Sequence, residues 1–225
     1  MESSRSRLLP ALAALLVLVG CGGDPGAEAP RTEPAPAQAE QSAAESADPA
    51  ATGTPAEAAL AVALRAADLP PGWTVQANPV PNGDLSRNPS LQGLCGVTFS
   101  SESHRTAKFP SVGLNPAGDP AVVSEAIAYD SATAGALALT ELRDAFRSCP
   151  AQDRSFLPPP AIDGLAENVV VVRYQLAGGI TQDVVAQGRG AVVSVLIAED
   201  PAAGAMAARS IATRMAALPA PAIGL

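Results

Sequence analysis

The hydrophobic residues divide the chain into three parts. Leu8–Val19 is an apolar run broken only by Pro10, whereas residues 22–57 contain no Leu, Ile, Val or aromatic side chain. Residues 58–225 alternate short apolar runs with turn residues, and only this part has the side chains that a core requires. We therefore expect a single folded domain over residues 58–225.

Two long helices are predicted by the spacing of apolar residues. Residues 131–148 place an apolar residue or glycine at every third or fourth position, and Asp130 or Ser131 can cap the first turn. A second helix is predicted over residues 201–217, because Asp200 offers an N-cap that is followed by a first-turn proline. The apolar face of the first helix consists of Gly135, Ala138, Leu139, Leu142, Ala145, Phe146 and Cys149, and that of the second includes Ile211, Met215 and Leu218.

Short segments of alternating or Val-rich sequence predict a sheet. Gly178-Gly179 and Gly188-Arg189-Gly190 offer the tight turns of antiparallel hairpins between the last three strands. The final strand is apolar on both faces and should be central. Helices packed on an antiparallel sheet give the α+β class. The predicted strands are residues 73–77, 94–100, 121–129, 169–176, 180–187 and 191–198, and a short helix over 56–67 precedes them.

The first 21 residues have the layout of a secretory signal peptide. Arg5 and Arg7 are followed by an apolar run that is shorter than the roughly 20 residues of a membrane-spanning helix. Leu18-Val19-Gly20-Cys21 resembles the bacterial lipobox, which implies that residues 1–20 are removed and that Cys21 carries a diacylglycerol with palmitate-type chains. We expect a lipoprotein that is anchored to the cell membrane through Cys21 and faces the extracytoplasmic side.

Residues 21–57 are predicted to be the lipidated Cys21 and a disordered linker. The segment from residue 22 to 57 is rich in Pro and Ala and holds seven acidic residues and one basic residue. It offers nothing to bury that could offset the loss of chain entropy on folding. The linker should therefore let the domain stand away from the membrane.

Charge and composition exclude several classes of partner and cofactor. The formal net charge is −8, and the chain has one lysine and seven aromatic residues, so it lacks a phosphate-binding face and a stacking platform for nucleic acid. One histidine and three cysteines cannot complete a Cys₄ or Cys₂His₂ zinc site. We expect no nucleic acid, metal or other cofactor.

With Cys21 lipidated, Cys95 and Cys149 remain, and two thiols in an exported domain usually pair. The disulfide would fasten the helix over residues 131–148 to the segment around Leu94. The alternative is a redox pair or a nucleophilic cysteine, but the sequence contains no Cys-x-x-Cys motif.

His104 is the only histidine, so a Ser-His-acid triad would have to use it. Ser100, Ser101 and Ser103 are near in sequence, but the chain has neither a G-x-S-x-G elbow nor a Ser-x-x-Lys motif. We expect His104 to lie in a surface turn without a catalytic role. Asp163 and Glu167 are further acidic candidates, Asp119, Asp130 and Asp200 are expected in turns and caps, and Trp73 is expected to be buried.

Several motifs together resemble one family. Ala67-Asp68-Leu69-Pro70-Pro71-Gly72-Trp73 follows a short helix and precedes Cys95-Gly96, and Ala128-Tyr129-Asp130-Ser131 opens a helix that ends in Phe146-Arg147-Ser148-Cys149-Pro150. With the Val-rich and Gly-turned strands that follow, residues 58–218 are similar to actinobacterial sensor-domain lipoproteins related to the extracellular domain of PknH-type serine/threonine kinases. The resemblance implies a twisted antiparallel sheet with flanking helices, a cleft for a small ligand, and no established catalytic residues.

These features lead to three hypotheses. The first is a non-enzymatic, lipid-anchored lipoprotein whose sensor-like domain binds a small molecule, a lipid or an envelope partner in a cleft between the sheet and the helix over residues 131–148. The second is an envelope hydrolase that uses His104 with a nearby serine. The third is a purely structural or protein-interaction lipoprotein.

Overall fold

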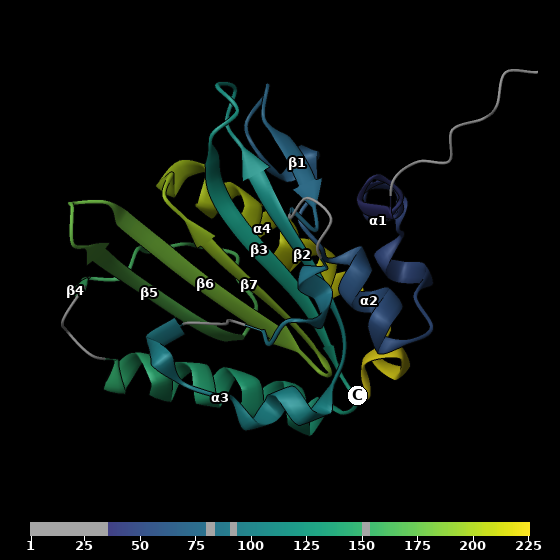
Figure 1. Ribbon diagram of the computed structural model, residues 1–225. Coiled ribbons are helices and arrows are strands. Elements are labelled where there is room, and N and C mark those ends of the chain that lie inside the picture. The colour runs from purple at the N-terminus through teal and green to yellow at the C-terminus, as the bar shows by residue number, and fades with distance from the viewer. Residues whose placement is uncertain (1–35, 80–83, 91–93, 150–153) are drawn as a thin grey trace, which may run out of the picture. The chain divides into compact units, whose positions relative to one another are not determined.

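The computed structural model describes residues 36–79, 84–90, 94–149 and 154–225. Within these residues, one seven-stranded antiparallel sheet has the strand order β1-β2-β3-β7-β6-β5-β4 (Figure 1). The predicted α+β class is confirmed, and β7 is central as predicted. No helix of the described residues is long and apolar enough to span a membrane. The strands are β1 Thr74–Ala77, β2 Arg105–Leu114, β3 Pro120–Tyr129, β4 Arg154–Leu157, β5 Asn168–Leu176, β6 Thr181–Arg189 and β7 Val192–Ala198.

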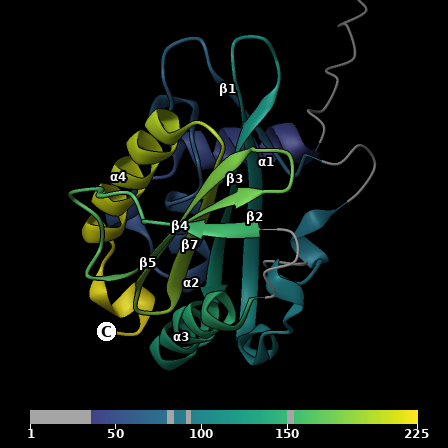
Figure 2. The same cartoon turned by 90° about the vertical axis from the view of Figure 1, so that its left-hand side faces the viewer.

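In the described part of the chain, four α-helices flank the sheet and cover both of its faces. In Figure 2 the sheet is seen from the side of β4, with α4 on one face and α3 beneath. Contacts join α2 to β2, β3 and β7, α4 to β6 and β7, and α3 to β5, β6 and β7. The helices are α1 Pro36–Ser46, α2 Pro55–Ala61, α3 Ala132–Ser148 and α4 Pro201–Ala217, and Ser131 and Asp200 cap the last two as predicted.

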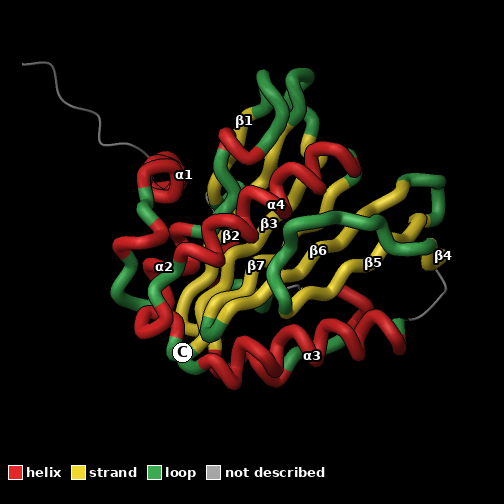
Figure 3. Tube along the Cα trace, turned by 180° about the vertical axis from the view of Figure 1, so that it is seen from behind, coloured by secondary structure: helices red, strands yellow, loops and turns green. Residues whose placement is uncertain are grey.

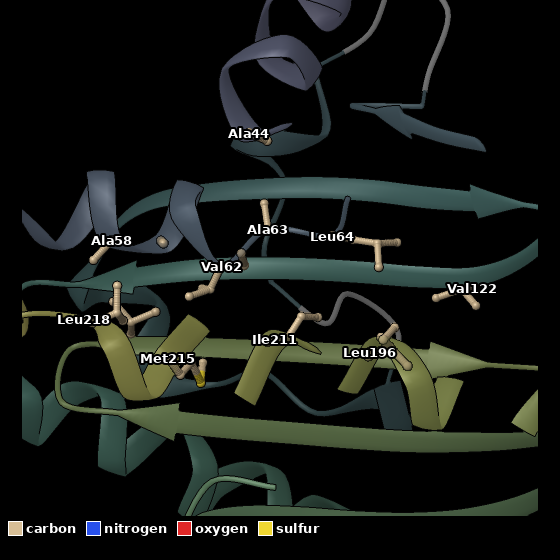
Figure 4. Close-up of a cluster of buried hydrophobic side chains, with 14 of the residues drawn as sticks. Ala44, Ala58, Val62, Ala63, Leu64, Val122, Leu196, Ile211, Met215 and Leu218 are labelled. Atoms are coloured by element: carbon tan, nitrogen blue, oxygen red, sulfur yellow. The ribbon is translucent and has the colours of Figure 1, made fainter. Parts of the chain in front are cut away.

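Each face of the sheet has its own apolar cluster, because side chains alternate between the two faces of a strand. On β3, Val122 packs on the α4 side and Ile127 on the α3 side. Figure 4 shows the first cluster, in which side chains of α1, α2 and α4 meet those of β3 and β7, and Trp73 is partly buried against it. The second cluster includes Leu139, Leu142 and Phe146 of α3 with Val170, Val184 and Val193 of the sheet.

Residues 36–57 are predicted above to be disordered linker, and for this segment the prediction is wrong. Helix α1 lies within it, and tertiary contacts hold the helix in place. The Glu45 carboxylate accepts a hydrogen bond from the Ala66 amide at 2.8 Å, and Arg65 donates to the carbonyl of Ala47 at 2.7 Å. An alanine-rich helix of this length is marginal in isolation, so these contacts explain why it forms.

The folded part therefore begins before Ala58. Helix α2 starts with a capping box, in which the Thr54 side chain accepts from the Glu57 amide while the Glu57 carboxylate accepts from the Thr54 amide. The helix is shorter than the predicted 56–67, since a 3₁₀ turn occupies Ala66–Asp68.

The predicted strand over residues 94–100 is also wrong. This segment contains the 3₁₀ turn Leu94–Gly96, in which Cys95 has a φ of 52°, and Ser100 begins a second 3₁₀ turn. Two strands, β2 and β4, were not predicted. Pro110 and Gly113 interrupt the apolar pattern of β2, and Pro110 is accommodated because β1 ends beside its neighbour Ser111.

The Cys95–Cys149 disulfide is present as predicted. Cys149 is the C-cap of α3, so the bond joins the end of this helix to the turn at residues 94–96. Closing a loop of this length restricts the unfolded chain, which stabilises the fold by about 4 kcal/mol in the chain-entropy account.

A buried ion pair fastens α4 to the N-terminal segment. Asp68, which is 2% exposed, accepts two hydrogen bonds from the Arg214 guanidinium, at 2.5 Å and 2.7 Å. The same guanidinium donates to the carbonyls of Ala61 and Ala63 at 3.0 Å, where the chain leaves α2. The bidentate geometry pairs both buried charges, and an unpaired charge here would be costly.

We expect Asp68→Asn to lower the free energy of unfolding by about 3 kcal/mol, because it leaves the Arg214 charge buried without a counter-ion. Urea denaturation followed by circular dichroism measures the loss. Asp144→Asn is the control: it breaks the exposed Asp144–Arg147 pair and should cost less than about 1 kcal/mol. Equal losses in the two variants would show that the buried pair does not hold α4.

Candidate functional site

A pocket of about 790 Å³ opens beside the C-terminal half of α4, and we call it the α4 pocket. Its volume lies within the range of small-molecule sites, roughly 300–1,000 Å³. Three segments far apart in sequence form most of its walls, namely the loop before β5, the turn between β6 and β7, and α4, and Leu225 completes them. Figure 3 shows the loop before β5 crossing the sheet beside α4. The lining residues are Gly164–Asn168, Gly188–Gly190, Ala212, Thr213, Met215, Ala216 and Leu225.

The buried side chain of Gln187 fixes the first wall of the α4 pocket. Its amide oxygen accepts from the Ala166 backbone N–H, and its amide nitrogen donates to the Ala208 carbonyl in α4, both at 2.9 Å. Gln187 is 2% exposed, so leaving either end unpaired would carry the full desolvation penalty. One side chain of β6 thus holds both the loop and the helix.

Arg189 and Gly190 fix the second wall. The Arg189 guanidinium donates to the carbonyls of Met215 and Leu218, which satisfies groups at the C-terminal end of α4 and places a cation where the helix dipole favours one. A Cβ on Gly190 would lie 2.3 Å from the carbonyl oxygen of Ile223, and Gly190 has a φ of +58°. Only glycine fits this turn without displacing the C-terminal 3₁₀ turn.

The chemistry of the α4 pocket suits binding. Thr213, Glu167 and Asn168 offer a hydroxyl, a carboxylate and an amide, while Ala212 and Met215 give an apolar floor. The one guanidinium in the wall, that of Arg189, is already engaged by two carbonyls. Within the described residues, no group of three or more His, Cys, Asp or Glu could hold a metal ion.

The α4 pocket lies elsewhere than the cleft predicted from sequence. The helix predicted over residues 131–148 borders a smaller groove of about 400 Å³, whereas the larger space lies next to α4 on the opposite face. Of the acidic candidates, Glu167 lines the α4 pocket, and Asp163 is exposed in the preceding loop. The residues that shape this pocket were not identified from the sequence. Gly188 and Gly190, which line it, were predicted only as a hairpin turn, and Gln187, which fixes its wall, was predicted only as the last residue of a strand.

His104 lies in a surface turn, as predicted, and it has an acidic partner. Its Nδ1 atom is 2.9 Å from a carboxylate oxygen of Asp130, and both side chains are about half exposed. Hydrogen bonds from His104 and Ser131 hold the pKa of Asp130 below its usual range. The pair supplies two of the three groups of a Ser-His-acid triad, but both side chains are open to solvent, unlike those of an enclosed catalytic site.

The three serines near His104 in sequence have other partners. The Ser100 hydroxyl donates to the Glu141 carboxylate in α3, and the Ser103 hydroxyl donates to the Ser100 carbonyl. The Ser101 hydroxyl interacts with Tyr129. The described contacts therefore do not assemble the hydrolase arrangement that pairs His104 with one of these hydroxyls.

Glu141 instead anchors the turn to α3. Its two carboxylate oxygens accept from the backbone amides of Ser100 and Ser101 at 2.9 Å and 3.1 Å. Burial raises the pKa of Glu141, but the hydrogen bonds from Ser100 and Ser101 outweigh burial and leave the pKa below its usual value. The serine-rich turn is thus explained as a structural connection. The lipidation candidate, Cys21, lies outside the described residues.

Comparison with known proteins gives a distant likeness among solved structures. No protein-family model matches the chain, and no curated protein matches it. Among solved structures, the chain is similar to the extracellular domain of PknH from Mycobacterium tuberculosis, with 14% identity and a TM-score of 0.40 over 51% of this chain and 66% of that chain. The chain thus matches slightly less than two thirds of that structure. The relationship is a distant one of fold and carries no statement about a ligand or an activity.

We expect Glu141→Gln to destabilise the protein by about 1 kcal/mol at pH 7, because it weakens charge-assisted hydrogen bonds at a partly exposed site. The pKa of Glu141 is lowered in the folded state, so its contribution is present above the ordinary pKa and is lost as the pH falls through the folded value. The difference between the variant and the wild type should therefore shrink at pH 3.

Denaturation at pH 7 and pH 3 measures this effect. Asp163→Asn, at an exposed loop position, is the matched control and should change stability little at either pH. A Glu141→Gln difference that stays constant between the two pH values would contradict the assigned role of the carboxylate.

Proposed function

We propose that this protein is a non-enzymatic, lipid-anchored lipoprotein that faces the extracytoplasmic side of the cell membrane and binds a small ligand in the α4 pocket. The observation that carries the proposal is the pocket itself, which has the volume and the mixed apolar and polar walls of a small-molecule site. The ligand we infer is partly apolar, because alanine and methionine form the floor and a few polar groups lie at the rim.

Binding rather than catalysis is favoured by what surrounds the pocket. Its charged wall residues are Glu167 and Arg189, and the Arg189 guanidinium is committed to the end of α4. Glu167 is exposed and has no second carboxylate among the lining residues for acid–base work. The wall is also rigidly held, since Gln187 ties the loop to the helix, and a preformed wall reduces the entropy lost on binding.

Two features support the proposed location. The sequence Leu18-Val19-Gly20-Cys21 follows a charged start and an apolar run, which is the order of a lipoprotein signal peptide. The Cys95–Cys149 disulfide is of the kind that persists in an oxidising compartment outside the cytoplasm. Both fit a domain that works at the outer side of the membrane.

The ligand can be sought by native mass spectrometry of the protein purified from the envelope of its own host. We expect an additional mass that leaves on denaturation. Ala216→Trp should abolish it, because position 216 lines the α4 pocket and is exposed, so the indole would occupy the pocket without disturbing the core.

Ala217→Trp is the matched control, since position 217 is the next residue of α4, is exposed and does not line the pocket. It should retain the additional mass. If both variants lose the additional mass, or if neither does, the ligand does not bind in the α4 pocket. If the wild-type protein carries no additional mass, a protein-interaction role is favoured instead.

The anchor can be tested by Cys21→Ser. Because thioether formation requires the Cys21 sulfur, the variant should lose the diacylglycerol mass and should move from the detergent phase to the aqueous phase on Triton X-114 partitioning. Cys95→Ser is the control for the loss of a thiol elsewhere and should remain in the detergent phase. Equal partitioning of wild type and Cys21→Ser would refute the anchor.

A further inference from the structure

Half of β5 forms an open edge of the sheet. Strand β4 pairs only with Arg173–Leu176, so the described residues place no strand beside Asn168–Val172 on that side. The Leu176 amide points toward the β6 side, because it donates a hydrogen bond to the carbonyl of Ile180, the residue directly before β6. Because backbone groups alternate in direction along a strand, the N–H and C=O of Val169 and Val171 point outward.

The segment that follows β4 is prevented by its sequence from covering this edge. Continuing β4 beyond Leu157 would bring Pro158, Pro159 and Pro160 beside β5, and proline has no N–H for the ladder. The chain instead crosses the α4 face, where the Ala166 amide meets Gln187. The described part of the chain therefore leaves the position next to the first half of β5, in line with β4, open.

A groove of about 400 Å³ borders the open edge on the α3 side. Its apolar part contains Phe146 and Phe156, whose ring centroids are 6.3 Å apart in an edge-to-face arrangement. Phe156 is 43% exposed, so an occupant of the groove would bury apolar surface that now faces solvent. The four valines at positions 169–172 form the other wall. Figure 2 looks onto this side of the sheet, with β4 nearest the viewer and α3 below.

The groove is cationic at its rim. Arg143 and Arg147 of α3 both line it. Arg147 pairs with Asp144 at an exposed site, whereas Arg143 has no hydrogen-bond or ion-pair partner among the described residues. An occupant of this groove would therefore gain by bringing a carboxylate to Arg143.

The open edge lacks the usual protection against pairing. Natural edge strands carry lysine, proline or a β-bulge to prevent association. Asn168–Val172 has none of these, and its pairing with β6 runs without a register shift. A run of four valines, in which Val169 and Val171 point their backbone groups outward, fits a strand that can accept a partner.

We propose that the open edge of β5 binds an extended, acidic segment of a partner protein as an added strand. The segment would lie in line with β4, would hydrogen-bond to Val169 and Val171, and would place an apolar side chain against the exposed ring of Phe156 and a carboxylate at Arg143. About five residues fill the open length, or roughly 17 Å at the rise of a β-strand. This site is separate from the α4 pocket and does not depend on the function proposed for it.

A second copy of the chain is a poorer occupant. Two β5 edges that pair about a two-fold axis would bring both pairs of arginines to the same face of the joined sheet. Arg143 would then meet like charge instead of a carboxylate, which is unfavourable. An acidic segment of a different protein complements the groove in both its backbone and its charge.

The experiment selects peptides from a phage-displayed library of random 12-residue sequences on the full-length protein. The recovered peptides are then synthesised, and their affinities are measured by fluorescence anisotropy. We expect sequences in which β-branched residues alternate and at least one acidic residue is present. Arg143→Glu should weaken their binding by about tenfold or more, whereas the control Arg209→Glu, at an exposed position of α4, should leave it unchanged.

The hydrogen bonds of the added strand are tested from both sides. Val171→Pro removes one outward N–H without removing a bond to β6 and should weaken binding as strongly as Arg143→Glu. A peptide that is N-methylated at alternate residues, in each of the two possible frames, tests the same bonds with the wild-type protein. At least one frame should fail to bind.

Three results would overturn the proposal. They are the absence of peptides enriched over a surface coated with blocking protein, binding that Arg143→Glu and both N-methylated peptides leave unchanged, and a dimer in solution that Val171→Pro dissociates. The last result would assign the edge to a second copy of the chain.

Discussion

The buried pair of Arg214 and Asp68 is the constraint on which the arrangement of the domain depends. Arg214 lies near the C-terminal end of α4 and Asp68 lies in the connection between α2 and β1, so the pair joins the last helix to the beginning of the domain. The same guanidinium binds the carbonyls at which α2 ends. An unpaired buried charge costs several kcal/mol, so the arrangement in which α4 packs beside α2 is strongly favoured over one in which they separate. The apolar cluster of Figure 4 fills the space that this pair determines.

The α4 pocket follows from that placement. Once α4 is fixed by Arg214, Gln187 and Arg189 of β6 are the groups that reach it from the sheet, one at Ala208 and the other at the carbonyls of its last turn. Because both side chains extend from β6 to α4, they keep the backbones of the strand and the helix apart and leave a space between them. The loop before β5 closes one side of this space, where the Ala166 amide donates to Gln187. The loop and the helix that bound the pocket are therefore held by the hydrogen bonds of Gln187 and Arg189, which makes its shape a property of the fold and independent of any ligand.

The elements that sequence predicted correctly are those whose local signals agree with their packing. The helix over Ala132–Ser148 has a cap, a single apolar face and a terminating proline, and the hairpins from β5 to β7 have glycine turns. The errors have physical causes as well. Helix α1 forms through contacts with Arg65 and Ala66, which no local pattern reveals, whereas the Thr54-x-x-Glu57 capping box of α2 was a readable signal that lay within the assumed linker. The walls of the α4 pocket come from three distant segments, so no single motif could locate it.

The two proposed sites lie on opposite faces of the sheet, yet they share one segment. The loop that closes the α4 pocket ends at Asn168, and the same residue begins the open edge of β5. Gln187 holds this loop through the Ala166 amide, two residues before Asn168, so the start of the edge strand is fixed whether or not a ligand occupies the pocket. Coupling between two binding sites is reciprocal, so a ligand that leaves the affinity for the partner unchanged implies a partner that leaves the affinity for the ligand unchanged. A loop that is already held transmits little, so the pocket and the open edge should bind their partners independently although Asn168 belongs to both.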